Sequence, residues 1–138
     1  MSRPATRLTR LVDLARLREE QARQTVAVAR SRERAATARV DASESALRHP
    51  GMLEGHPFRF GTALLALGRQ DLEQATGAAR VAGEALEAEL GRWRATHTEL
   101  ETLERLDDRL YEAFVAERRR QEQRETDELA GTRGRSER

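Results

Sequence analysis

The sequence predicts an all-α protein, in which two long helices form an antiparallel coiled-coil hairpin and the second helix is longer than the first. Three observations support this fold class. The 22 Ala, 25 Arg, 17 Leu and 18 Glu make up 82 of the 138 residues, a composition typical of long helices and coiled coils. Apolar residues recur every seven residues on both sides of one segment rich in Gly and Pro. Only 4% of the residues are aromatic, which disfavours a thick multilayer core.

The first helix is expected over residues 4–48. Neither Gly nor Pro follows Pro4 in this segment, and proline is well tolerated in the first turn of a helix. Two series of positions, each with a period of seven, indicate a left-handed coiled coil. One series is Leu8, Ala15, Ala22, Ala29, Ala36 and Ser43, and the other is Val12, Glu19, Val26, Glu33, Val40 and Leu47.

A hinge is expected over residues 49–61, because prolines and glycines interrupt the helical pattern there. These residues are Pro50, Gly51, Gly55, Pro57 and Gly61. The two segments on either side would then fold back on each other within a single coiled-coil domain that spans residues 1–138.

The second helix is expected over residues 62–130, capped by Thr62, with a frayed tail over residues 131–138. It also carries two series with a period of seven. One is Leu65, Leu72, Ala79, Leu86, Trp93, Leu100, Asp107 and Phe114, and the other is Gly68, Ala75, Ala82, Glu89, Thr96, Leu103 and Leu110. The four interior glycines, Gly68, Gly77, Gly83 and Gly91, each weaken this helix by about 1 kcal/mol relative to Ala.

The register of the hairpin follows from where the chain is expected to fold. A fold centred near residue 54 pairs Ala15 with Trp93 and Ser43 with Leu65, and it brings Glu19 towards Glu89. Residues 1–50 hold 11 Arg and 6 acidic residues, a charge of +5, whereas residues 51–138 hold 14 Arg and 18 acidic residues, a charge of −4. Oppositely charged halves suit each other better than they suit nucleic acid.

In this register the second helix extends about 25 residues beyond the first, starting near Leu103. This overhang first carries an apolar stripe, which includes two aromatic residues and has no partner within the hairpin. Such a stripe is typical of an interaction site. The charged segment ERRRQEQRETDEL, residues 117–129, follows the stripe. The alternative is a solvated terminal helix held by local charge pairs. The stripe consists of Leu103, Leu106, Leu110, Tyr111, Phe114 and Val115.

No pattern in the sequence indicates catalysis, a cofactor or a metal. The chain has no Cys, and His49 and His56 flank the hinge with only Glu54 between them as a further ligand. His97 is more consistent with the boundary of the helix seam than with a catalytic base. Acidic residues among the arginines and a net charge of +1 argue against nucleic-acid binding, and no apolar run is long enough to span a membrane.

The C-terminal segment LERLDDRLYEAFVAERRRQEQRETDELAGTR, residues 103–133, resembles the end of the FliJ family of flagellar export proteins. Residues 8–20, LTRLVDLARLREE, are similar to the start of that family. Length and two-helix layout agree over almost the whole chain. The resemblance implies a stalk-like component of the flagellar type III protein export apparatus, without enzyme activity, at the cytoplasmic face of the inner membrane.

The same resemblance implies the partners. Family members bind the hexameric export ATPase FliI with the end where both termini lie, contact the export gate protein FlhA, and carry export chaperones. Members use aromatic residues for gate binding, and residues 61–92 here contain none, so no gate-binding residues are assigned. The residues that the resemblance implies for partner binding are Leu8, Leu11, Leu14, Leu110, Tyr111, Phe114, Arg118, Gln121, Glu122, Arg124, Glu125, Asp127 and Glu128.

Two other functions fit the same pattern. One is the equivalent stalk protein of a virulence-type type III secretion system, similar to the YscO group. The other is a generic structural coiled coil that forms a homodimer through its overhang.

Overall fold

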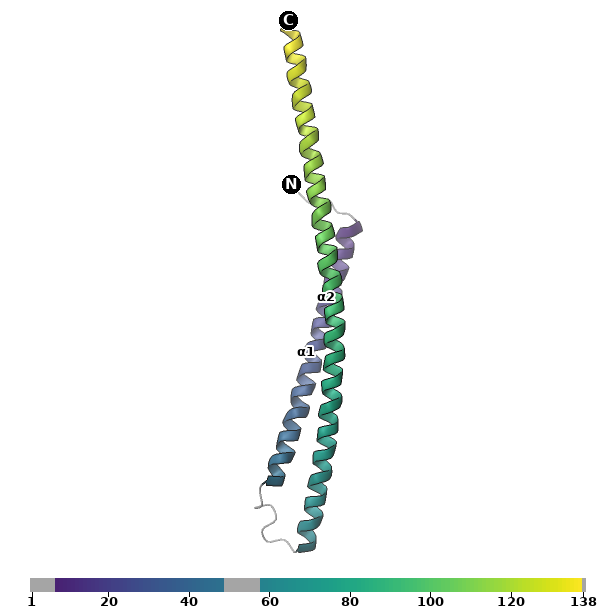
Figure 1. Cartoon of the computed structure of the whole chain (residues 1–138), viewed down its shortest axis with the longest axis vertical. Coiled ribbons are helices and arrows are strands. Elements are labelled where there is room, and N and C mark those ends of the chain that lie inside the picture. The colour runs from purple at the N-terminus through teal and green to yellow at the C-terminus, as the bar shows by residue number, and fades with distance from the viewer. Residues whose placement is uncertain (1–6, 49–57, 138) are drawn as a thin grey trace. The chain divides into compact units, whose positions relative to one another are not determined.

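The fold is all-α, with two long helices packed against each other. The structure is a computed structural model, and it describes residues 7–48 and 58–137. Helix α1 spans Arg7–Arg48, with 42 residues, and helix α2 spans Phe58–Ser136, with 79 residues (Figure 1). The predicted fold class, including the longer second helix, is confirmed. No helix in the described residues is long and apolar enough to cross a membrane.

The chain divides into two compact units, each of which contains parts of both helices. Unit 1 consists of Met1–Leu17 and His97–Arg138, and unit 2 consists of Arg18–Thr96. In both units the two helices pack antiparallel, because positions in contact rise along α1 while they fall along α2.

The described part of α1 buries the side of the helix that the period of seven predicts. Within residues 7–48, every member of the two predicted series is buried or half-buried, and the positions between them are exposed with few exceptions. The members are small or apolar apart from Glu19 and Glu33 and the hydroxyl of Ser43, so the seam is narrow. A narrow seam of this kind is typical of a coiled coil.

The predicted register of the hairpin was wrong. In unit 2, Leu47 meets Gly68, one heptad further along α2 than a fold centred near residue 54 requires. Ser43 hydrogen-bonds Asp71 instead of meeting Leu65, and Glu19 meets Trp93 instead of Glu89. A shift of seven residues keeps the same positions in the seam, so the heptad pattern alone cannot distinguish the two registers.

Gly68 shows why the observed register fits. A Cβ atom at this position would lie 2.7 Å from Cδ2 of Leu47, which is closer than real Cβ contacts come. An alanine at this position would push the end of the Leu47 side chain aside, whereas glycine leaves it in place. The other glycines within the seam-forming part of α2, Gly77, Gly83 and Gly91, have no atom within 4 Å of such a Cβ.

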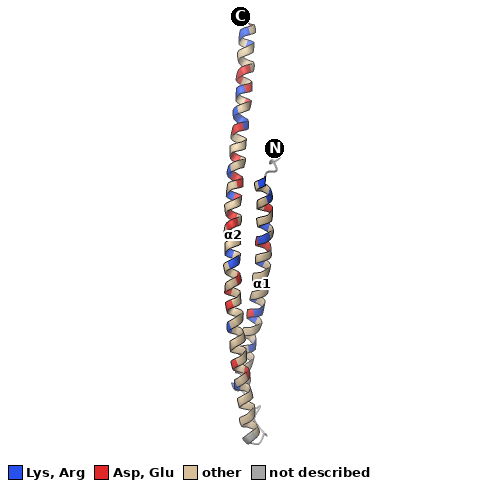
Figure 2. Ribbon diagram, turned by 90° about the vertical axis from the view of Figure 1, so that its right-hand side faces the viewer, with Lys and Arg blue, Asp and Glu red and all other residues tan. Residues whose placement is uncertain are grey.

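The ion pairs between the described parts of the two helices join arginines of α1 to acidic residues of α2. In unit 2, Nη2 of Arg39 lies 3.0 Å from Oδ1 of Asp71, and Oγ of Ser43 donates to Oδ2 of Asp71 at 2.7 Å. The hydrogen bond from Ser43, helped by Arg39, holds the pKa of Asp71 below its ordinary value of 3.8. Figure 2 shows the charged residues along both helices.

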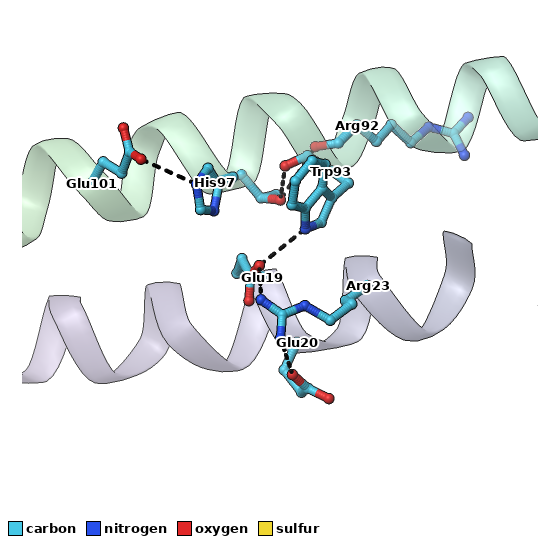
Figure 3. Close-up of polar contacts among 8 residues, drawn as sticks. Glu19, Glu20, Arg23, Arg92, Trp93, His97 and Glu101 are labelled. Atoms are coloured by element: carbon cyan, nitrogen blue, oxygen red, sulfur yellow. Dashed lines mark hydrogen bonds and ion pairs between the residues drawn. The ribbon is translucent and has the colours of Figure 1, made fainter. Parts of the chain in front are cut away.

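Glu19 is a buried carboxylate in the seam of unit 2. Its side chain accepts a hydrogen bond from Nε1 of Trp93 at 3.0 Å, and it forms an ion pair with Nη2 of Arg23 at 2.7 Å (Figure 3). Since Glu19 is only 5% exposed, these partners replace the water that a free carboxylate would bind. The tryptophan thus contributes a polar contact to the seam as well as its ring.

The ends of α2 differ from the sequence expectation. The helix begins at Phe58, before the expected cap at Thr62, and it continues to Ser136 through the segment expected to fray. Gly61 costs only about 1 kcal/mol in a helix, which neighbouring turns can offset. At the other end, the hydroxyl of Thr132 donates to the carbonyl of Glu128, and the amide of Glu137 donates to the carbonyl of Arg133. The second of these bonds satisfies a carbonyl group of the last turn.

Candidate partner-binding surface

The seam of unit 1 ends in a small apolar core. Val12, Ala15 and Leu100 are buried together, and Leu103 packs against them. The sequence placed Leu103 at the start of the overhang, and this was wrong because the true register brings it opposite the first turns of α1. The overhang therefore begins after Leu103.

An ion pair marks one flank of this core. Nε of Arg16 lies 3.3 Å from Oε1 of Glu104. Both side chains are exposed, so the pair contributes at most about 1 kcal/mol to stability. The pair shows that Arg16 and Glu104 lie on the same flank of the two helices.

The opposite flank of unit 1 is apolar and exposed. At about 100° per residue, Leu11 lies roughly 140° around α1 from Arg16, and Leu106 lies roughly 160° around α2 from Glu104. Leu14 is also turned away from Arg16. All three leucines are exposed. We call this surface, with Leu110 and Phe114, the apolar flank.

The apolar flank continues along α2 past the end of the core. Leu110 is 54% exposed and Phe114 is 40% exposed, so the described part of α1 does not cover them. Tyr111 and Val115 are half-buried. Exposed large apolar side chains therefore continue along α2 from Leu106 to Phe114.

The charged end of α2, residues 117–137, is exposed throughout. Its ion pairs are local: Arg118 lies 3.7 Å from Glu122, and Arg120 lies 3.6 Å from Glu117. Further along the helix, Nε2 of Gln123 donates to Oδ1 of Asp127 at 3.0 Å.

One shallow hollow brings several predicted binding residues together. It is lined by Phe114, Glu117, Arg118, Gln121, Glu122 and Glu125, so the aromatic end of the apolar flank adjoins charged side chains. Of the other predicted residues, Leu8 is half-buried in the seam, while Arg124, Asp127 and Glu128 are exposed further along α2.

The sequence predicted no metal site, and the histidines are the remaining side chains to locate. Among residues 7–48 and 58–137, no group of three His, Asp or Glu side chains could hold a metal ion. His97 forms a local pair with Glu101, with 3.1 Å between Nε2 and Oε1 (Figure 3). His49 and His56 lie outside the described residues.

Comparison with protein families decides what kind of protein carries this surface. A family model described as flagellar FliJ protein matches residues 4–138, which is essentially the whole chain. The chain belongs to the FliJ family. Comparison with curated proteins and with solved structures gives no match.

Membership in the FliJ family makes the chain a protein associated with the flagellar type III export apparatus. The resemblance found in residues 103–133 is thereby confirmed and extended to both helices. The family match also favours flagellar export over the virulence-type secretion system, which the sequence had left open.

Proposed function

We propose that the FliJ-family chain acts as a stalk, whose apolar flank and charged α2 end dock on the ring of the export ATPase. The observation that carries this proposal is the exposure of Leu110 and Phe114 on a helix that continues for more than twenty residues of charged surface. Exposed large apolar side chains beside charged ones are typical of a protein-binding surface.

The division of labour within the surface follows from its chemistry. Leu11, Leu14 and Leu106, with Leu110 and Phe114, offer apolar area whose burial stabilises a complex by roughly 25 cal/mol per Å². Arg118, Gln121, Glu122 and Glu125 around the hollow offer hydrogen bonds and ion pairs that set the orientation. We expect the leucines and Phe114 to dominate affinity and the charged residues to dominate specificity.

The remaining partners belong to the same proposal. A stalk held in the ATPase ring would couple ATP turnover to an FlhA-like export gate and would receive export chaperones. This work takes place at the cytoplasmic face of the inner membrane, with the chain itself attached only through the apparatus. The chain needs no catalytic residue for it, since the coupling is mechanical and electrostatic.

Capture by the cognate export ATPase tests the docking surface. The double variant Leu110→Glu and Phe114→Glu should weaken capture by at least about tenfold, because two apolar contacts would be replaced by desolvated charges. Leu67→Glu is the matched control, since Leu67 is 62% exposed and lies in unit 2. A chain truncated after Arg109 should bind as weakly as the double variant.

Two results would contradict the proposal. One is capture of the double variant at the wild-type level, with helix content unchanged by circular dichroism. The other is a tight homodimer in light scattering that dissociates when Leu110 and Phe114 are replaced, because the overhang would then serve self-association.

A further inference from the structure

A second exposed apolar feature lies within unit 2, as a groove between α1 and α2. It holds about 500 Å³, which is within the range of ligand-binding clefts. Its walls are mostly small: Val28 and Ala29 come from α1, and Gly77, Ala78, Val81 and Ala85 come from α2. It contains none of the residues of the apolar flank or the charged end.

The groove is open to solvent although it is apolar. Val28 is 50% exposed and Val81 is 58% exposed. The flanks of a two-helix coiled coil normally carry charged residues, as this unit does on its other flank at Arg23 and Arg80. One flank is therefore suited to water, and the other is suited to a further helix.

Small side chains in the groove permit close approach of a backbone. Space beside Gly77 is open, since no atom lies within 4 Å of a Cβ built there. The stretch of α2 from Gly77 to Glu89 spans about 18 Å at 1.5 Å per residue, which matches roughly three turns of a helix. A single helix with a face of small or medium apolar side chains fits this length.

The charged residues of the groove favour a partner with a negative charge at this position. Arg32 lines the groove, and among the described residues it forms no ion pair or hydrogen bond. Glu89, also in the lining, already pairs with Arg92. The groove thus presents an unpaired cation beside apolar walls, and a carboxylate on the partner would complement it.

These charges also argue against a second copy of the chain as the occupant. A two-fold arrangement would bring Arg32 of both copies to the same interface. The groove has no free carboxylate to pair with them, because Arg92 already holds Glu89. A partner with its own acidic residue meets no such repulsion.

We propose that the groove between Val28 and Val81 docks an amphipathic helix of a partner protein, which carries a carboxylate beside a face of small apolar residues. This site is separate from the ATPase-docking surface and does not depend on it. It adds a helix to unit 2 and would convert the two-helix seam into a local three-helix bundle.

A matched pair of peptides tests the proposal on the full chain. The first is an amphipathic 18-residue helix of Ala and Leu with one flanking Glu, and the second has Lys in place of that Glu. The methyl resonances of Val28 and Val81 should shift on titration, while those of Val115 in unit 1 should not. The Glu peptide should bind up to about fivefold more tightly, since exposed ion pairs are weak.

Variants of the chain sharpen the result. Val81→Glu should abolish the shifts, whereas Leu67→Glu should not change them. Arg32→Glu should reverse the preference to the Lys peptide, and Arg30→Glu, on the other flank of α1, should leave it unchanged. Neither Val81→Glu nor Arg32→Glu should alter capture by the export ATPase.

Three outcomes would overturn the inference. The Val28 and Val81 resonances do not move at millimolar peptide. The shifts occur equally in the Val81→Glu variant, so that binding lies elsewhere. The resonances move with protein concentration in the absence of peptide, which would make a second copy the occupant.

Discussion

Replacing Trp93 by Phe should destabilise the hairpin by removing a buried hydrogen bond in addition to part of the ring. The substitution keeps an aromatic ring in the seam but removes the Nε1 donor, which lies 3.0 Å from Oε1 of Glu19. A hydrogen bond to a charged group is worth about 1.5–3 kcal/mol, and at 5% exposure Glu19 has little access to replacement water. We expect the free energy of unfolding to fall by about 2–3 kcal/mol.

A double-mutant cycle isolates the hydrogen bond from the packing of the ring. In a Glu19→Gln background the acceptor is neutral, so Trp93→Phe should cost only about 1 kcal/mol. Urea unfolding followed by circular dichroism at 222 nm measures all four proteins, since fluorescence is lost with the only tryptophan. An equal loss in both backgrounds would refute the reasoning, because the cost would then come from packing alone.

Two further predictions follow from unit 2. Gly77→Ala should raise the free energy of unfolding by about 1 kcal/mol, since the helix gains propensity and the new Cβ meets nothing within 4 Å. Gly68→Ala should gain less or lose stability, because its Cβ would lie 2.7 Å from Leu47; a larger gain at Gly68 in urea unfolding would contradict the observed register. The hydrogen bond from Ser43 lowers the pKa of Asp71, so this contact stabilises the fold above pH 3.8 and is lost as the pH falls through the folded-state pKa. Asp71→Asn should therefore flatten the decline in thermal stability in acid, and an unchanged decline would exclude this role.

The sequence was sufficient to predict which side of each helix is buried. The period of seven in α1 runs from Leu8 to Leu47, and every position in it is buried or half-buried. This succeeds because heptad spacing fixes the angular position of a residue on its helix. Heptad spacing also predicted the apolar stripe at Leu110 and Phe114. These two side chains are exposed because the stripe continues along α2 beyond the partner helix.

The register could not be predicted from the period, because a shift of one heptad leaves the same residues in the seam. Leu47 opposite Gly68 could have been recognised, since a leucine and a glycine in the two seams fill one space between them. The groove was missed because Val28 and Val81, its most exposed apolar side chains, lie outside the predicted series. The signal was present as small apolar residues at flank positions, where a solvated coiled coil would carry charges.

The carboxylate of Glu19 affects whether α1 pairs with α2 or with the α1 helix of another copy. If two α1 helices paired in parallel, their two Glu19 carboxylates would lie opposite each other in a buried seam. Neither would receive a hydrogen bond from an indole. Within its own chain, the Glu19 carboxylate accepts a hydrogen bond from Trp93. Glu19 therefore disfavours parallel pairing of two α1 helices and favours pairing of α1 with α2.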